Sequence, residues 1–385
     1  MKQSLTRHTI QQWQALYRDP WLLSLVSWVP VLLFVTLWSV FSSNVARDLP
    51  VGVVDLDQSR LSRSLIRQYD ASPTLLLEQR FGDVARGTEA LRRGAVFGLI
   101  IIPPDFERDA VAGRAPTVSA MVTGQYLLVG RNVNSALSQA HATFTAGIET
   151  VRNLSTLSPL AAQALAAAVP IATQITPLSN SNTNYAQFLV SAMLPAMWQI
   201  LMVATTIMVL ADGRRRDPRS WPGDEPVKRF AGMVLALVPL FLLHGVWYLS
   251  WLYVIMGWPM HGSWAVLLLA QLLTVVGSIG IGALFFLCTL DAARALSIAA
   301  FYAASGLAFM GVTFPVTDMV LPARIWRSLV PICHYIEIQI AQVDYGAPLS
   351  YQADQLLWLG GFCTTLLFGI VRIRRLGAAR KEAGA

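Results

Sequence analysis

The stretch that decides the fold runs from residue 230 to residue 290. It begins FAGMVLALVPLFLLHGVWYLSWLYVIMGW and contains no Asp, Glu, Lys or Arg. A second stretch without these charged residues covers 153–211. A bilayer core about 30 Å thick takes about 20 apolar residues in a helix, so the sequence predicts a polytopic α-helical membrane protein. Six transmembrane helices are expected, at 21–43, 186–210, 230–256, 264–288, 295–313 and 355–371.

Composition supports this class, with 55% hydrophobic residues, 13% charged residues and a mean hydropathy of +0.51. The net charge of +7 would suggest a nucleic-acid partner in a soluble chain. In a membrane protein, the placement of Lys and Arg instead indicates orientation. With the N-terminus in the cytoplasm, the cytoplasmic side collects 15 of these residues, and the opposite short loops hold only Arg324 and Arg327. Both termini are therefore predicted to be cytoplasmic, and no nucleic-acid partner is expected.

Residues 44–185 are expected to form an extracytoplasmic α/β domain between the first and second transmembrane helices. Residues 50–55, 74–77 and 96–102 have the apolar pattern of strands, and helical patterns lie between them. A long helix or helical pair is expected from residue 127 to about 169. Asp55 and Asp57 follow the first strand and could act as a carboxylate pair, but we favour a turn or helix-capping role.

Motifs for catalysis are missing from the sequence. None of the three lysines follows a glycine, so the Gly-Lys-Ser/Thr core of a P-loop is not present. The five histidines form neither a His-Glu-x-x-His nor a His-x-His motif, and there is no Gly-x-Ser-x-Gly elbow. We therefore expect a chain that is not an enzyme and that binds no metal or cofactor itself.

Three short motifs stand at informative places around the spans. Arg18-Asp19-Pro20 precedes the first span, and 184–188 leads through Pro195 into the second. Between the fifth and sixth spans, 311–315 is followed by Pro322, Pro331 and His334-Tyr335. The motifs follow one another in this order, and the chain has one span, then a large α/β domain, then five spans. In both respects nearly the whole chain resembles the membrane subunits of type-2 ATP-binding-cassette (ABC) exporters. One departure is the Asp212-to-Pro218 segment, where many members carry a Glu-x-Gly-Thr type motif.

The resemblance implies a permease in a bacterial cytoplasmic (inner) membrane. Its partners would be a separate ATPase in two copies, which binds ATP and Mg, and a second permease copy that is identical or a paralogue. A periplasmic adaptor would be an additional partner. It also implies that a hairpin at 314–352 dips into the outer leaflet and that the helix at 1–20 packs against the ATPase. The pattern of 1–20 alone is equally that of an amphipathic helix on the inner membrane surface. The basic tail at 374–385 would be cytoplasmic.

Two groups of residues are candidates for function. The loop 212–229 offers a charged contact for the ATPase, although its arginines could equally set orientation and bind lipid head groups. Asp291 and Arg294 are three residues apart, and we favour their pairing with each other. The coupling candidates are Arg18, Arg214, Arg215, Arg216, Asp224, Glu225, Asp291 and Arg294. The conduit or external-gate candidates are His244, Pro315, Pro331, His334, Tyr335 and Glu337.

Other features of the spans bear on mechanism and substrate. Gly277, Gly280 and Gly282 are interpreted as helix-packing positions, and Pro30, Pro195 and Pro239 permit kinks. The spans offer almost no charged lining, which favours a hydrophobic or amphipathic substrate such as a lipid or a drug-like molecule. The main alternative is a receptor or assembly scaffold. A lipid enzyme lacks a recognisable nucleophile, and an ion-driven transporter would normally show intramembrane acids or an inverted repeat.

Overall fold

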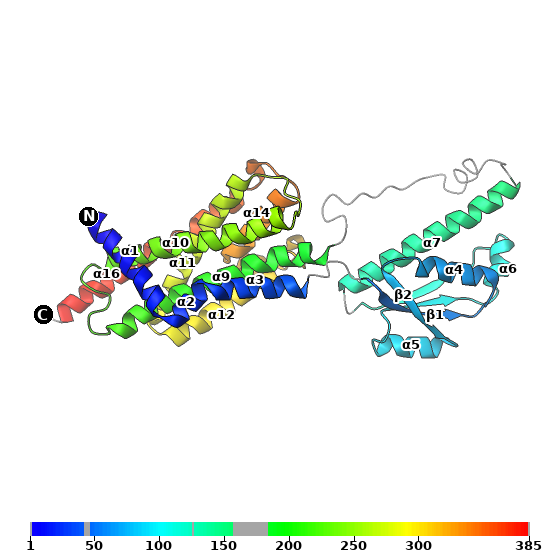
Figure 1. The fold of residues 1–385 in the computed structure, drawn as a ribbon, viewed down its shortest axis with the longest axis horizontal. Coiled ribbons are helices and arrows are strands. Elements are labelled where there is room, and N and C mark those ends of the chain that lie inside the picture. The colour runs from blue at the N-terminus through cyan, green and yellow to red at the C-terminus, as the bar shows by residue number, and fades with distance from the viewer. Residues whose placement is uncertain (1, 42–46, 125–126, 157–183, 384–385) are drawn as a thin grey trace. The chain divides into compact units, whose positions relative to one another are not determined.

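The computed structural model describes residues 2–41, 47–124, 127–156 and 184–383. The chain forms two compact units: a helical unit of residues 1–44 and 177–385, and an α/β unit of residues 45–176. Figure 1 shows both units and the labels of their elements. The long helix or helical pair expected from residue 127 to about 169 lies outside the described residues beyond residue 156.

Most of the helical unit consists of long apolar helices. Five are long and apolar enough to cross a membrane, or six if α2 and α3, bent by 43° at their junction, form one span. These counts refer to the described residues. The elements of this unit are α1 (Lys2–Arg18), α2 (Pro20–Val26), α3 (Trp28–Val40), α9 (Tyr185–Arg216), α10 (Pro226–Ser250), η1 (Trp251–Ile255), α11 (Trp264–Thr289), α12 (Ala292–Phe309), η2 (Val316–Asp318), α13 (Leu321–Ser328), α14 (Pro331–Val343), η3 (Leu349–Tyr351), α15 (Ala353–Phe362) and α16 (Thr365–Ala383).

The span expected at 21–43 is broken near its middle. Asp19 caps α2, since its carboxylate accepts hydrogen bonds from the backbone N–H groups of Trp21 and Leu22 at 2.9 and 3.2 Å. The helix ends at Val26 and restarts at Trp28. Pro30 has no N–H with which to bond the carbonyl of Val26 four residues earlier, so the backbone ladder cannot continue through this point.

The last two expected spans differ from the structure at their ends. α12 covers 292–309 rather than 295–313: Asp291 caps its start, and Gly311, with φ +84°, follows its end. The helical region expected at 355–371 begins at Ala353 and continues to Ala383, with a junction at residues 363–364. The basic segment that follows residue 373 is therefore helical as far as Ala383.

Glycines let α11 approach its neighbours closely. A Cβ atom on Gly282 would lie 2.8 Å from the backbone oxygen of Val203 in α9 and 2.9 Å from the Cβ of Thr206. A Cβ on Gly277 would lie 2.9 Å from that of Phe362, and one on Gly280 would collide with the Thr365 side chain. These contacts agree with the packing role predicted for the three glycines.

The α/β unit is built on a four-stranded sheet in the order β2-β1-β3-β4. The first three strands are parallel, and β4 pairs antiparallel with β3. Buried residues of α4 and α7, including Leu65 and Val133, share one core with the sheet, and Gly87 of α5 packs against Val54 and Leu99. The elements are β1 (Leu49–Asp55), α4 (Arg60–Asp70), β2 (Leu75–Phe81), α5 (Val84–Arg92), β3 (Gly98–Ile102), α6 (Phe106–Val111), β4 (Ser119–Val122) and α7 (Leu127–Thr156).

Asp55 and Asp57 shape the turn after β1. The Asp55 carboxylate accepts hydrogen bonds from the N–H groups of Asp57 and Gln58 and from the Ser62 hydroxyl. Asp57 accepts from the N–H of Glu107, in the first turn of α6, at 3.1 Å. The capping interpretation of the two acids is therefore confirmed. The second strand extends to Phe81, four residues beyond the end expected at 77, because Gln79, Arg80 and Phe81 pair with Gly52, Val53 and Val54 of β1.

Candidate functional site

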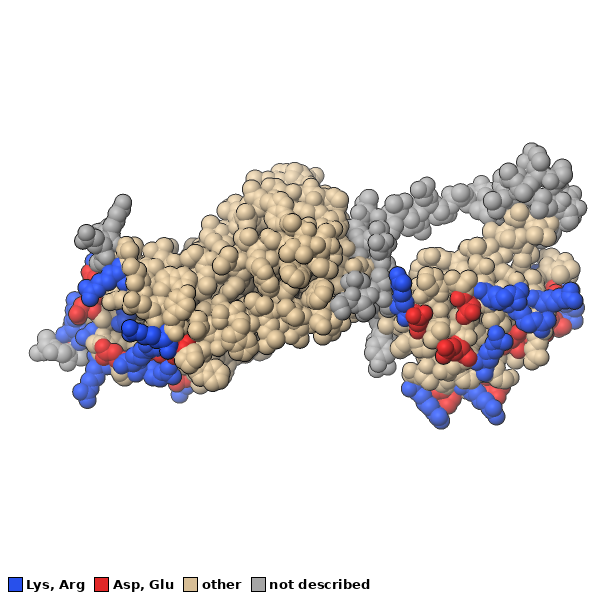
Figure 2. Space-filling view, in the orientation of Figure 1, with Lys and Arg blue, Asp and Glu red and all other residues tan. Residues whose placement is uncertain are grey.

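A group of charged side chains lies at the end of the helical unit where α1 begins and α16 ends. On the face of the helical unit shown in Figure 2, Lys, Arg, Asp and Glu gather at this end, and the remainder is uncharged. The centre of the group consists of Asp19, Asp212, Arg215 and Arg216, here called the Asp–Arg cluster. The cluster brings together the start of α2 and the end of α9, which are almost 200 residues apart in the sequence.

Asp212 is the buried member of the Asp–Arg cluster. Its side chain is only 7% exposed, and its oxygens lie 2.9 Å from Nη2 of Arg215 and 2.6 Å from Nε of Arg216. Both arginines also approach Asp19, at 3.4 and 3.8 Å. The spacing of three and four residues along α9 places these arginines beside Asp212. Arginines in the last turn also suit the negative end of the helix dipole, whereas Asp212 depends on them for its stability there.

Arg214 joins the end of α9 to the turn between α11 and α12. Its guanidinium donates to the carbonyl of Leu290 and lies 5.9 Å from the centre of the Trp221 ring. Asp291 follows in that turn, and its carboxylate accepts a hydrogen bond from the backbone N–H of Arg294 at 2.8 Å. The expected side-chain pairing of Asp291 with Arg294 is wrong, because Asp291 acts as the N-cap of α12.

The loop between α9 and α10 is held by both ends of the chain. Arg380 of α16 donates to the carbonyl of Ser220 and lies 4.0 Å from Asp224. Glu225 pairs with Lys228, and its other oxygen lies 3.2 Å from Nε2 of His8 in α1. A groove of about 830 Å³ between α1, the end of α9 and this loop is lined mostly by polar and charged side chains. The predicted coupling segments 1–20 and 212–229 therefore lie together.

The remaining coupling candidates are at the surface. Arg18 ends α1 and Arg294 lies in the first turn of α12, and both side chains are exposed. Neither forms an ion pair within the described part of the chain. Asp224 is 88% exposed, and its 4.0 Å approach to Arg380 is the long limit of an ion pair. These three residues are available to a partner, and a role in coupling stays a prediction for them.

Glu225 provides a pH-dependent contact between α1 and α10. Hydrogen bonds from Lys228 and then from His8 lower the pKa of the Glu225 carboxyl below its ordinary value of 4.5. A carboxyl with a lowered pKa stabilises the fold above its unfolded pKa, and this contribution is lost as the pH falls through the folded pKa. We therefore expect Glu225→Gln to lower the melting temperature at pH 7. The difference from the unmodified protein should shrink as the pH falls below about 4.5 and vanish below the folded pKa.

The measurement is a thermal unfolding series of the detergent-solubilised protein between pH 7 and pH 3. Lys228→Gln is the matched variant, because Lys228 is the main cause of the lowered pKa. It should reproduce most of the pH-dependent difference. A difference in melting temperature between Glu225→Gln and the unmodified protein that stays constant from pH 7 to pH 3 would contradict this assignment.

The conduit candidates of α14 are engaged by other helices. Tyr335 is buried, and its hydroxyl accepts hydrogen bonds from the Tyr248 hydroxyl at 2.7 Å and from Nε2 of Gln271 at 3.3 Å. The ring nitrogens of His334 lie 2.5 Å from Oε1 of Gln355 and 3.0 Å from the carbonyl of Ser328. Both residues therefore hold α14 in place, and direct contact with a substrate stays a prediction.

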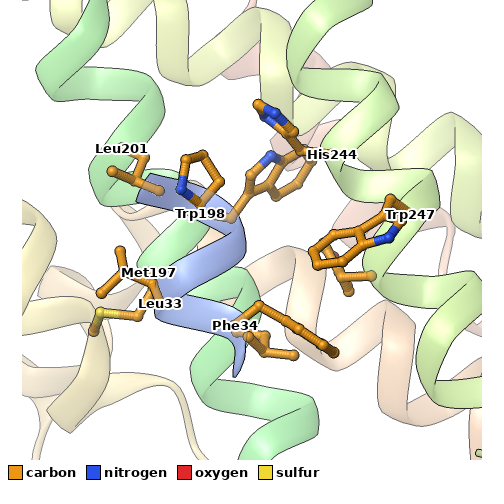
Figure 3. A pocket seen from close by; sticks show the side chains of 10 residues that line it. Leu33, Phe34, Met197, Trp198, Leu201, His244 and Trp247 are labelled. Atoms are coloured by element: carbon orange, nitrogen blue, oxygen red, sulfur yellow. The ribbon is translucent and has the colours of Figure 1, made fainter. Parts of the chain in front are cut away.

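Glu337, Pro331 and Pro315 have distinct positions around the same segment. Glu337 is 37% exposed and lies 3.0 Å from the guanidinium of buried Arg327 in α13. Pro331 occupies the first turn of α14, where the missing N–H is tolerated. Pro315 precedes η2, next to the short helices of the expected hairpin. The sixth candidate, His244 of α10, lies apart from this group and beside α3 (Figure 3).

Uncharged polar residues are the part of the helical unit that sequence reasoning missed. Gln199 of α9 accepts a hydrogen bond from the N–H of Ile332 at 2.9 Å, which satisfies a free donor at the start of α14. Gln339 of α14 donates to the carbonyl of Ser191 at 2.8 Å. That carbonyl has no helical partner, since Pro195 stands four residues later. A proline inside an apolar helix therefore indicates a free carbonyl, and a free carbonyl predicts a side-chain donor on a neighbouring helix. This signal was available in the sequence.

In the described ranges, no group of three or more His, Cys, Asp or Glu residues is placed to hold a metal ion. The charged end of the unit instead offers exposed arginines and acids around a groove, an arrangement suited to contact with another protein or with lipid head groups.

Comparison with known families agrees with the order of spans and loops described above. The model of a family described as ABC-2 family transporter protein matches residues 20–372, from the first residue of α2 to the middle of α16. No curated protein matches the sequence closely enough to count as a relative. Since the family model covers most of the chain and at least part of every membrane-span candidate, the chain belongs to the ABC-2 family of transporter proteins and is a multi-pass membrane transport subunit.

Proposed function

We propose that the chain is the permease subunit of an ABC exporter, driven by a separate ATPase that docks at the end of the helical unit carrying the Asp–Arg cluster. The observation that carries this proposal is the meeting of α1, the end of α9 and the 217–225 loop around one groove, with Arg380 of α16 bonded to the same loop. A displacement of the loop would be transmitted to α2 through Asp19 and to α12 through Leu290.

The excess of Lys and Arg in the termini and in the loops at this end supports a cytoplasmic position for it. The α/β unit would then be outside the cytoplasm, and the membrane would be a bacterial inner membrane. Two permease copies and two ATPase copies would form the transporter, as expected from the family. A periplasmic adaptor would be an additional partner of the α/β unit.

The composition of the spans supports a hydrophobic or amphipathic substrate. Deep polar contacts in the helical unit, among them Gln271, Tyr248 and Tyr335, involve uncharged groups. An ion or a highly charged solute would need compensating charge along its path. Export of a lipid or a drug-like molecule from the cytoplasm or the inner leaflet is the function that these side chains suit best.

The test is affinity purification of the tagged full-length chain from its host in mild detergent, followed by an ATPase assay. We expect an ATPase subunit to co-purify. Arg219→Glu should decrease both its recovery and its hydrolysis, because Arg219 is exposed in the 212–229 loop and has no ion pair in the described part of the chain. The loss is expected to be roughly tenfold, as for an interface hot spot worth about 1.4 kcal/mol.

Arg324→Glu is the matched control, since Arg324 is also exposed but lies in α13, far from the 212–229 loop along the chain and outside the groove. It should leave the recovery of the ATPase unchanged. Repeated recovery of the chain alone, without associated ATPase activity, would favour a receptor or assembly scaffold. Equal losses for the two variants would contradict docking at the 212–229 loop.

A further inference from the structure

One edge of the sheet in the α/β unit carries no charged residue. The strand order β2-β1-β3-β4 makes β2 and β4 the two edge strands. β2 contains Glu78 and Arg80, both exposed, and charged side chains on an edge strand hinder its pairing with a further strand. β4 has the sequence SAMV, and no Asp, Glu, Lys or Arg occurs between Arg114 and Arg131. Charge therefore protects the β2 edge of the sheet but not the β4 edge.

The hydrogen bonds of β4 show which of its backbone groups are unused. Directly after β4, the N–H of Thr123 donates to the carbonyl of Phe97 at 2.9 Å. Successive residues of a strand turn their N–H and C=O groups to opposite sides, so Met121 also bonds to β3. Ala120 and Val122 turn theirs to the outer edge of the sheet. Neither has a hydrogen-bond partner there among the residues that the structure describes.

The outer edge of β4 is accessible. Ser119 and Ala120 are exposed, and Met121 is 40% exposed although it is apolar. The strand contains no proline, and its register with β3 is continuous, without a bulge. A row of unused N–H and C=O groups with neither charge, proline nor bulge is a template for pairing with another strand.

We propose that β4 pairs antiparallel with β4 of a second copy of this chain, so that one sheet runs through both α/β units. A two-fold axis requires the same residues on both sides of the contact. The outward groups of β4 meet this requirement when Ala120 lies opposite Val122 of the second copy. The axis then passes between the two Met121 residues, with Cα atoms about 4.5 Å apart, as in a non-hydrogen-bonded pair of an antiparallel ladder.

The chemistry of the edge and the number of permease copies favour a second copy as the occupant. An identical uncharged strand brings no like charges into opposition, and the two exposed Met121 side chains would cover each other. So short a ladder is too small for free molecules, since specific interfaces usually bury about 1,200–2,000 Å². Two copies within one transporter would hold their α/β units at a high effective concentration, at which a short ladder suffices. In this respect the inference rests on the two permease copies of the proposed function.

The test is disulfide cross-linking of the tagged full-length chain in host membranes, with copper–phenanthroline as the oxidant. The expected Cα separation at position 121 lies within the range that a disulfide spans. Met121→Cys should therefore give about tenfold more covalent dimer than Glu78→Cys, which places an exposed cysteine on the other edge strand. The unmodified protein measures the background from the natural cysteines, which are Cys288, Cys333 and Cys363.

A second substitution in the Met121→Cys protein removes the bonds of the outer edge. Ala120→Pro deletes an outward N–H that β3 does not use, so it should lower the dimer yield to the background. Ala120→Ser is the matched control, because it keeps the N–H and should keep the cross-link. Ala120→Lys, which leaves the backbone unchanged and adds a charge to the edge, should act like the proline. Melting temperatures close to that of Met121→Cys would separate lost pairing from lost folding.

Native mass spectrometry of the purified complex counts the permease copies. Two copies, with no more cross-linking of Met121→Cys than of Glu78→Cys, would overturn the edge pairing and leave the proposed function standing. A single copy would contradict the two-copy transporter and the edge pairing together. Cross-linking of Met121→Cys to a protein of another mass would assign the edge to a different partner and also overturn the inference.

Discussion

Replacing Asp212 by alanine is expected to destabilise the helical unit by roughly 1–3 kcal/mol and, on the proposed function, to lower ATP hydrolysis by the complex with the ATPase. The carboxylate is buried and contacts two arginines, which would lose their main counter-charge at the end of α9. This loss of stability is smaller than is usual when a buried ion pair is broken. Arg215 and Arg216 are 71% and 44% exposed, so water would partly replace the lost partner.

The measurement combines thermal unfolding in detergent with ATP hydrolysis by the co-purified complex. Asp224→Ala is the matched control, since Asp224 is a carboxylate of the same loop but is 88% exposed. It should change the melting temperature little. If Asp212→Ala and Asp224→Ala gave the same melting temperature and the same hydrolysis rate, the Asp–Arg cluster would have no structural role.

Gly282→Ala is expected to have the second large effect, a loss of roughly 1–3 kcal/mol of stability from overpacking. The added Cβ would lie 2.8 Å from the backbone oxygen of Val203, which cannot rotate away as a flexible side chain could. α9 and α11 would have to separate, although both are central to the core of the helical unit. The measurement is the melting temperature of the purified protein, together with its retention by size-exclusion chromatography.

Gly360→Ala provides the matched control in α15. A Cβ at Gly360 meets nothing within 4 Å, so the same substitution should be neutral or stabilise the protein by up to about 1 kcal/mol through better helix propensity. A melting temperature for Gly282→Ala equal to that of the unmodified protein would show that α9 and α11 are less closely packed than the structure indicates.

Much of the fold could be predicted from the sequence because long uncharged stretches have few structural solutions. The stretches 153–211 and 230–290 identified α9, α10 and α11. The break at Ser27 was not predicted, since Pro30 alone is compatible with a continuous kinked helix. The ends of α12 were misplaced by a few residues because Asp291 and Gly311 set them locally, whereas hydropathy changes gradually.

The candidate site was predictable in part. The charges of the 212–229 loop marked the charged end, but the partners of that loop could not be read from local patterns. Asp19, Leu290 and Arg380 lie at least 70 residues from the side chains that they contact in α9 and the loop. Uncharged residues such as Gln199 and Gln339 carry no pattern of their own, and their roles depend on which backbone groups the neighbouring helices leave free.

The use of side chains to bond carbonyls freed by prolines has a consequence for how this sequence can diverge. Pro195 leaves the carbonyl of Ser191 to Gln339. A descendant that loses Pro195 regains a backbone donor in α9, so Gln339 becomes free to change. Loss of Gln339 while Pro195 remains would be selected against. We therefore expect Pro195 and Gln339 to be gained and lost together during evolution, although 144 positions separate them in the sequence.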